Sequence, residues 1–135
     1  ELARGDREGA AQLALSFAVT TGTAEVLKRV TGVERPDGSN DLSFPSGHAA
    51  RAFSSAAYVR ARHGLLPALP LYAGALYVGH TRVEARRHRW GDVLGAALLA
   101  EASAQWLVTG TGERRRGWAL ALDGEAVSAV YSARW

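Results

Sequence analysis

The sequence predicts a single, mostly α-helical domain that ends in a β-hairpin. Its 135 residues are 47% hydrophobic and 21% charged, which favours one folded domain with its own core and argues against disorder. Alanine, a strong helix former, supplies much of the apolar fraction. Apolar residues recur at three- and four-residue steps up to about residue 108, and an alternating pattern follows them. We therefore expect one domain over residues 1–135, with a helical core at about 10–108 and a tail at about 115–134.

The periodic apolar pattern places four helices, at residues 10–30, 46–62, 71–80 and 91–108. Residues 1–9 are polar and are expected to form a surface lead-in. Pro67 and Pro70 punctuate the segment before the third helix, so that helix is expected to start at Leu71. Residues 83–89 then form a charged connection to the fourth helix.

The tail alternates apolar and other residues in two short runs, at 116–122 and 126–135, on either side of Asp123-Gly124. An Asp-Gly pair between two such runs is a strong local signal for a β-hairpin. Because a lone hairpin is only marginally stable in water, we expect this one to pack on the helices.

The longest uncharged stretch, residues 64–81, contains two prolines and three glycines. A membrane-spanning helix needs about 20 predominantly apolar residues. We therefore expect the helices to form the core of a soluble or surface-associated domain. The chain starts at Glu1, so the sequence leaves open whether a signal peptide or a membrane helix precedes it.

The formal net charge is +3, but fifteen of the sixteen basic residues are arginine and only Lys28 is lysine. This bias makes the arginine count uninformative, and no stripe of basic and aromatic residues indicates a nucleic-acid partner. The chain has no cysteine, which excludes disulfides, zinc–thiolate sites and thiol catalysis.

The first chemical motif is Pro45-Ser46-Gly47-His48, which lies where the second helix should begin. The free backbone N–H groups at a helix amino end attract anions. Gly47 allows close approach of an oxyanion, and His48 in the first turn is placed to donate a proton. An ordinary serine cap beside a surface histidine is the competing interpretation.

A second pair of cations lies at the end of the first helix. Lys28 and Arg35-Pro36 are seven residues apart, so both side chains can reach one multiply charged oxyanion. The competing interpretation is a solvated helix carboxyl end, where cations are favourable in any case.

The third cluster is Thr81-Arg82 followed by His88 and Asp92. His88 and Asp92 are four residues apart, hence neighbours on one face if the helix includes both. A carboxylate on one ring nitrogen fixes the tautomer and leaves the other nitrogen as a nucleophile, which is the logic of covalent catalysis. A purely structural His–Asp contact remains the alternative.

Together, the three clusters resemble the signature of the type 2 phosphatidic acid phosphatase superfamily, which includes bacterial non-specific acid phosphatases and vanadium haloperoxidases. The resemblance spans residues 28–92 and implies a helical bundle of the acid phosphatase/vanadium haloperoxidase type. The third motif usually opens with serine, and Thr81 stands there. Its hydroxyl is kept, so we expect activity to survive.

The resemblance implies a role for each motif residue. His88 would attack phosphorus, Asp92 would orient it, and His48 would protonate the leaving alcohol. The phosphoryl oxygens would be held by Lys28, Arg35, Arg82 and the backbone at Ser46 and Gly47. No metal or other cofactor is implied, although vanadate would bind as a phosphate analogue. Of the neighbouring arginines, Arg86, Arg87 and Arg89, we expect mostly solvated charge, and attraction of an anionic substrate or a membrane surface is the alternative.

The function that follows is metal-independent hydrolysis of phosphate monoesters or pyrophosphates, with a phosphorylated membrane lipid or a small phosphomonoester as substrate. A membrane-surface association and a periplasmic or cell-envelope location with an extracytoplasmic site are expected from the resemblance. Three alternatives stay open: a non-specific soluble acid phosphatase, a vanadium-dependent haloperoxidase and a non-catalytic anion-binding envelope module.

Overall fold

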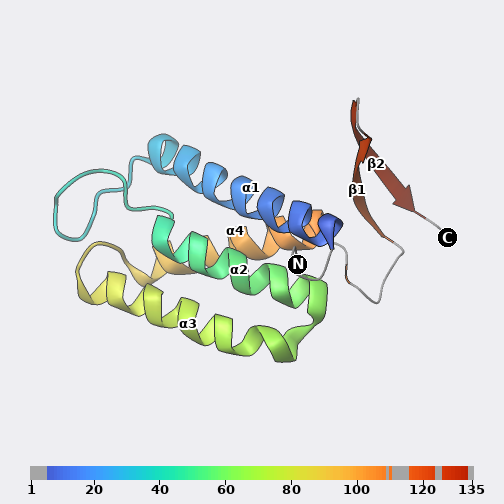
Figure 1. The fold of residues 1–135 in the computed structure, drawn as a ribbon. Helices are drawn as coiled ribbons and strands as arrows, with labels where there is room; N and C mark the ends of the chain where they lie inside the picture. Colours follow the sequence, from blue (N-terminus) through green and yellow to red (C-terminus); the bar gives the residue numbers. More distant parts are fainter. Residues whose placement is uncertain (1–5, 109, 111–115, 124–125, 134–135) are drawn as a thin grey trace.

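The computed structural model describes residues 6–108, 110, 116–123 and 126–133, with side chains for residues 6–108 and 110. Four helices run back and forth beside one another, so that the α1–α2 and α3–α4 loops lie at the same end of the bundle (Figure 1). The mostly helical fold predicted from the sequence is confirmed. The helices are α1 (Arg7–Thr31), α2 (Gly47–His63), α3 (Leu65–Glu84) and α4 (Trp90–Leu107).

Helix α2 lies in the middle of the bundle and packs against the other three helices. Its inner side is built mainly from alanine, whose small side chain lets neighbouring helices approach closely. Phe53 and Tyr58 are also buried there and supply most of the aromatic volume of the core. The α2 residues with 0% exposure are Ala49, Ala50, Ala56 and Ala57.

Helix α1 begins three residues earlier than the sequence pattern predicts, because a cap precedes it. The carboxylate of Asp6 accepts a hydrogen bond from the backbone N–H of Gly9 at 2.8 Å, which satisfies one of the free donors of the first turn. The helix ends at Thr31, one residue later than expected, and Gly32 after it has a φ of 56°, a left-handed conformation that suits glycine. The expected polar lead-in is therefore helical from Arg7 onward.

Helix α3 corrects the sequence prediction at both ends. It starts at Leu65 instead of Leu71 and continues to Glu84. Pro67 is the third helical residue, where no intrahelical partner for the N–H exists, and Pro70 gives up only one hydrogen bond near the start. The two prolines are therefore tolerated near the start of the helix. The charged connection shortens to residues 85–89.

Two strands, β1 (Arg116–Asp123) and β2 (Ala126–Ala133), follow the helices and pair antiparallel. Only their backbone is described. Of the predicted turn Asp123-Gly124, Asp123 is the last residue of β1 and Gly124 lies outside the described residues. The β-hairpin, its turn and its packing on the helices therefore remain predictions.

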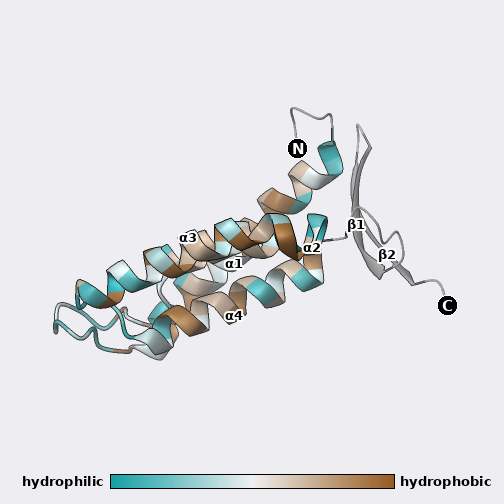
Figure 2. Cartoon of the chain, turned by 90° about the horizontal axis from the view of Figure 1, so that it is seen from below, coloured by the Kyte–Doolittle hydropathy of each residue, from teal (hydrophilic) through white to brown (hydrophobic). Residues whose placement is uncertain are grey.

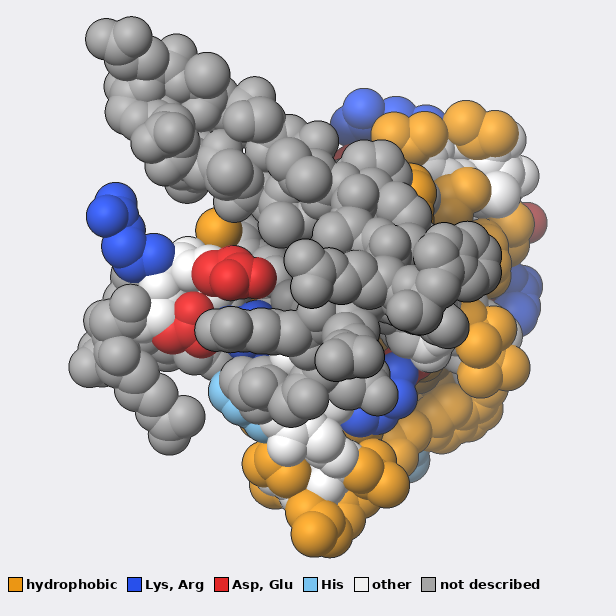
Figure 3. Space-filling model, turned by 90° about the vertical axis from the view of Figure 1, so that its right-hand side faces the viewer, with side chains coloured by type: hydrophobic (Ala, Val, Ile, Leu, Met, Phe, Trp, Pro, Cys, Tyr) orange, Lys and Arg blue, Asp and Glu red, His pale blue; other side chains and the backbone are white. Residues whose placement is uncertain are grey.

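Helices α3 and α4 bury small residues and expose large apolar ones, so the expectation of core helices holds for one face of each only. The described helices include none that is long and apolar enough to cross a membrane. Hydrophobic side chains gather along the lower edge of Figure 3, where α3 lies in Figure 1, and along its right-hand edge. Exposed large apolar side chains on α3 and α4 are Leu65, Leu66, Leu69, Leu71, Leu76, Tyr77, Trp90, Leu94, Leu98 and Trp106.

In contrast to the apolar outer faces of α3 and α4, the loops at the end of the bundle where α1 is joined to α2 are polar. In Figure 2 these loops, at the left end of the view, are drawn mostly in the hydrophilic colour, whereas the helices carry long hydrophobic segments. The polar end therefore concentrates the residues that carry chemistry.

Candidate active site

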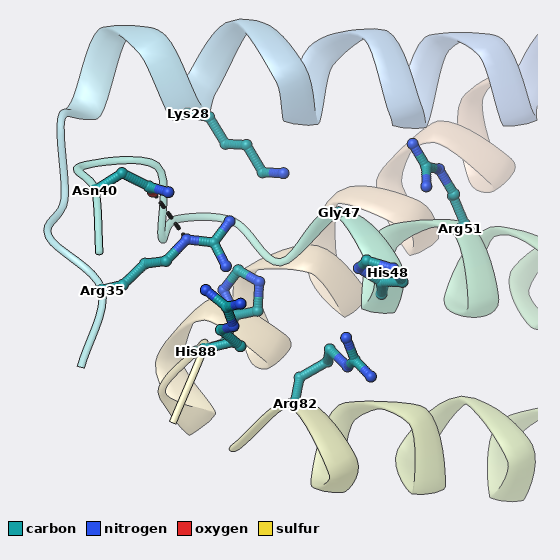
Figure 4. A pocket seen from close by; sticks show the side chains of 9 residues that line it. Lys28, Arg35, Asn40, Gly47, His48, Arg51, Arg82 and His88 are labelled. Carbon is teal, nitrogen blue, oxygen red and sulfur yellow. Dashed lines mark hydrogen bonds between the residues drawn. The ribbon is translucent and has the colours of Figure 1, made fainter. Parts of the chain in front are cut away.

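A pocket of about 340 Å³ opens at this polar end, where the three sequence motifs meet. Six of the eight predicted site residues line it. Figure 4 shows the side chains of Lys28, Arg35, His48, Arg82 and His88 pointing toward one another from α1, the α1–α2 loop, α2, α3 and the segment before α4. The other two, Ser46 and Asp92, are buried behind the lining at 0% and 4% exposure. The lining residues are Lys28, Arg35, Asn40, Gly47, His48, Arg51, Arg82, Arg87 and His88.

The lining is strongly cationic. Five of its nine residues carry a positive charge and none is a carboxylate. In addition, no group of three or more His, Asp or Glu side chains within the described ranges is arranged to hold a metal ion. The donor set of the pocket therefore suits a multiply charged oxyanion and repels a divalent cation.

Lys28 and Gly47 form one side of this anion site. A methyl group on Gly47 would lie 2.7 Å from the Lys28 Nζ atom, so the ammonium group occupies the space that a side chain would take. Gly47 is also the first residue of α2, where backbone N–H groups are free. The Lys28 ammonium group and the free N–H groups at the start of α2 can therefore bind the same anion.

His88 is held by a backbone carbonyl from a distant loop. Its Nδ1 atom lies 2.8 Å from the carbonyl oxygen of Ser43, and the side chain is buried. A carbonyl oxygen only accepts hydrogen bonds, so Nδ1 donates and carries the hydrogen. In the neutral ring, Nε2 then keeps its lone pair for the pocket.

Asp92 supports His88 from behind, mainly by holding Ser43. Its Oδ2 atom lies 3.5 Å from His88 Nδ1, farther than the Ser43 carbonyl. The same oxygen accepts hydrogen bonds from the Ser43 hydroxyl and, at 2.8 Å, from the Arg89 backbone N–H. The predicted role of Asp92 in orienting the ring is therefore incomplete, because Ser43 contacts both His88 and Asp92.

Ser46 departs from its predicted role. Its backbone N–H is donated to the Asp92 carbonyl oxygen at 3.0 Å, so it does not face a phosphoryl oxygen. Its hydroxyl instead accepts from the Ala49 N–H at 3.4 Å as the amino-terminal cap of α2. Ser46 therefore fixes the start of the helix, and Gly47 provides the exposed backbone.

His48, the second residue of α2, lines the pocket close to its cations. Burial and the positive charges of Arg82 and Arg51 lower the pKa of His48 below 6.5. The pKa of His88 is also lowered, first by burial and then by Arg35, against the opposing effect of Ser43 and Asp92. Without a bound anion both rings therefore favour the neutral form more than free histidine does.

The loop between α1 and α2 positions Arg35. The Arg35 Nε atom donates to the Asn40 side-chain oxygen at 2.8 Å, and its backbone N–H donates to the Asn40 carbonyl at 2.9 Å. The dashed line in Figure 4 marks the side-chain bond. This pair leaves the terminal nitrogens of the guanidinium group directed to the pocket.

Two of the arginines expected to be solvated tie this loop to the connection between α3 and α4. Arg87 lies 3.2 Å from the carboxylate of Asp37, and Arg89 donates to the carbonyl oxygen of Glu34 at 2.7 Å. The expectation of simple solvated charge is therefore corrected for these two.

Arg82 and Thr81 lie on the last turn of α3. Among the described residues, Arg82 Nε is buried with no hydrogen-bond partner, which leaves the group available to a bound anion. The Thr81 hydroxyl donates to the Val78 carbonyl oxygen at 2.8 Å within the helix. Replacement of the usual serine by threonine thus leaves a hydroxyl that is already satisfied.

Sequence reasoning missed Ser43, Asn40 and Arg51. No pattern marks the first two, because their contacts join loops to residues that are distant in the chain or depend on the shape of a turn. The sequence did indicate Arg51 as a pocket residue, because it follows His48 by three residues and that spacing places both on one face of the helix.

Comparison with known proteins agrees with the motifs. The family model of the PAP2 superfamily matches residues 9–116. The lipid A 4'-phosphatase of Helicobacter pylori is 36% identical over 110 residues, 73% of this chain and 56% of that protein. The lipid A 1-phosphatase of Porphyromonas gingivalis is 37% identical over 89 residues, 63% of this chain and 20% of that protein. No solved structure shows a significant match.

The chain belongs to the PAP2 superfamily. Both relatives are named as lipid A phosphatases. The chain spans about half the length of the first relative and a fifth of the second.

Proposed function

We propose that the protein is a metal-independent lipid phosphatase that works through a phosphohistidine on His88. One observation carries the proposal: His88 lines a cationic pocket with Nδ1 bonded to a carbonyl, which leaves Nε2 for the substrate. A site that only binds anions needs the cations, but it has no use for a histidine held in one tautomer.

In the proposed first step, the lone pair of His88 Nε2 forms a bond to phosphorus. The bond from phosphorus to the leaving oxygen breaks, and protonated His48 transfers its proton to that oxygen. The phosphorylated ring becomes positively charged, and the Asp92 carboxylate at 3.5 Å from Nδ1 stabilises that charge. In the second step a water molecule attacks phosphorus, the nitrogen–phosphorus bond breaks, and neutral His48 accepts the proton of the water.

The negative charge of the transferred phosphoryl group is balanced by the protein itself. Lys28, Arg35 and Arg82 line the pocket, and the start of α2 at Gly47 adds backbone dipoles. Asn40 holds the Arg35 guanidinium group at 2.8 Å, so this group needs little reorganisation at the moment of reaction.

A phosphorylated lipid is the substrate class that we propose. The relatives are named as lipid A phosphatases, and the apolar outer faces of α3 and α4 fit contact with a membrane surface. The proposed location is the cell envelope, with the site outside the cytoplasm, as the resemblance to the superfamily implies. A reporter fusion found inside the cytoplasm would contradict that location.

The decisive experiment is phosphate release by the EDTA-treated protein from lipid A, phosphatidic acid and phenyl phosphate. We expect turnover of the lipids, its loss in His88→Ala, and an acid-labile phosphoprotein in the parent. His80→Ala is the matched control, because this histidine is half exposed and outside the pocket lining. Robust turnover by His88→Ala would refute the nucleophile assignment.

The same substrates, with an added assay of halide oxidation, distinguish the alternative functions. Turnover of phenyl phosphate without any lipid activity would indicate a non-specific acid phosphatase. Halide oxidation with added vanadate and peroxide would indicate a haloperoxidase. Binding of phosphate with no turnover at all would indicate an anion-binding module.

Sedimentation with anionic phospholipid vesicles tests the membrane surface. We expect the Leu94→Ser, Leu98→Ser double variant to bind vesicles less tightly. Val26→Ser with Val30→Ser is the control, because these exposed apolar residues lie on α1. Equal loss in both double variants would contradict a docking role for the face of α4.

A further inference from the structure

The pocket contains more positive charge than one phosphoryl group requires. Lys28, Arg35 and Arg82 belong to the motifs, and Arg51 and Arg87 line the same pocket. Arg87 is already neutralised by Asp37 at 3.2 Å. Of the two pocket charges outside the motifs, Arg51 is therefore the one that still needs an explanation.

Arg51 has no ion pair with a carboxylate of residues 6–108. Within the part of the chain whose side chains are described, it makes no hydrogen bond or ion pair, and it is exposed at the pocket. It lies in the second turn of α2, whose first turn contains no acidic residue. A cation near the positive end of a helix and close to other cations is unfavourable unless an anion joins it.

The position of Arg51 relative to the two histidines defines which part of a substrate it meets. Figure 4 shows His48 between His88 and Arg51. Arg51 also acts electrostatically on His48, since its charge contributes to the lowered pKa of that ring. In an in-line displacement the nucleophile and the leaving oxygen lie on opposite sides of phosphorus. A group beyond His48 therefore faces the leaving group.

We propose that Arg51 forms a second anion subsite, which binds a negatively charged group on the leaving-group side of the substrate. This rests on the proposed function, in which His88 attacks and His48 protonates the leaving oxygen. The matching substrates are a diphosphate or a phosphate ester whose alcohol carries a further acidic group. A guanidinium group suits both, because its planar fork pairs with carboxylate and phosphate alike.

The test compares three probes that differ in the charge of the leaving group. Phenyl phosphate has a neutral leaving group, pyrophosphate has an adjacent anion, and 4-carboxyphenyl phosphate has a more distant one. In Arg51→Gln, the kcat/KM for an anionic-leaving-group probe relative to phenyl phosphate is expected to fall about tenfold, the effect of one charge-assisted hydrogen bond. Because the Arg51 substitution changes the pKa of His48 for every probe, the ratio of the two kcat/KM values cancels that effect.

Arg29→Gln is the matched control, because Arg29 is exposed, lies on α1 outside the pocket lining and also loses one positive charge. It should keep the parent ratio, and Arg51→Lys should fall between the parent and Arg51→Gln. A fall for pyrophosphate alone assigns the subsite to an adjacent phosphate, and a fall for the carboxyphenyl probe alone assigns it to a distal acid. Unchanged ratios in Arg51→Gln would overturn the inference.

Binding gives a readout that does not depend on turnover. By calorimetry, the parent should bind pyrophosphate about tenfold more tightly than orthophosphate, and Arg51→Gln should lose that preference. If no probe is hydrolysed while the preference is present and Arg51-dependent, the proposed function fails and the subsite stands. If phenyl phosphate is hydrolysed but the preference is absent, the subsite fails and the proposed function stands.

Discussion

Replacing Ser43 by alanine tests how His88 is held. The change removes the hydroxyl that donates to the buried carboxylate of Asp92 and keeps the backbone carbonyl that accepts from His88 Nδ1. The carbonyl then loses one of its two anchors, the other being the Ser43 backbone N–H bonded to the Val33 carbonyl at 2.8 Å. The ring is expected to lose its fixed orientation toward the pocket.

The size of the effect follows from the bond that is lost. A hydrogen bond to a charged group contributes about 1.5–3 kcal/mol, and both partners are buried here. Each 1.36 kcal/mol in the activation barrier changes a rate by about tenfold. We therefore expect kcat to fall roughly 10- to 100-fold. KM should change little, because the cations that bind the phosphoryl group do not contact Ser43.

The assay is steady-state hydrolysis of phenyl phosphate, with kcat and KM measured separately. Ser43→Thr keeps a hydroxyl and should recover most of the rate. Ser54→Ala is the matched control, because Ser54 is buried at 1% exposure and its hydroxyl has no hydrogen-bond partner among the described residues. In a double-mutant cycle with Asp92→Asn, the losses should be strongly non-additive.

Equal kcat values for Ser43→Ala and Ser54→Ala would refute the reasoning. So would a rise in KM with unchanged kcat, since that pattern indicates loss of binding that is uniform between ground state and transition state.

Three other tests address the pocket itself. Gly47→Ala puts a methyl group 2.7 Å from Lys28 Nζ, so the ammonium group must move and the inhibition constant of phosphate should rise about tenfold; Gly22→Ala, with open space around it, should change nothing. The lowered pKa values predict that kcat/KM peaks below pH 6.5, since activity rises as His88 loses its proton and falls as His48 loses its own; a peak above that pH would contradict these roles. Turnover should survive EDTA, because the lining contains no carboxylate; loss in EDTA and recovery with Mg²⁺ would contradict this.

The helices were predictable where local signals agree. The bounds of α2 and α4 lie within one residue of those expected from periodicity and from the flanking turn residues. The start of α3 was mispredicted, because Pro67 and Pro70 signal a break only when a helix already precedes them. At the start of a helix the same residues cost little, and packing against α2 outweighs that cost.

The site was predictable to the level of the motif residues. Spacing along α2 and around the start of α4 is a local property, so it indicated that Gly47, His48, His88 and Asp92 would lie at helix starts. The cap formed by Ser46 was the competing interpretation of its motif, because it is a local contact. The role of Ser43 and the bond from the Ser46 N–H to Asp92 were not predictable, since each is a contact with a residue more than forty positions away.

The sequence by itself determined which chemical groups are present and that Gly47 and His48 lie in the first turn of a helix, because helix geometry is a property of neighbouring residues. Only the tertiary structure decided which atoms meet: that a carbonyl of Ser43 faces the His88 ring, that Asp92 uses the Ser46 N–H, and that Arg51 lies beyond His48. Hydrogen bonds are short and directional, so they depend on the final placement of distant segments. For that reason the type of site was predictable from the chain, and the way its histidine is held was not.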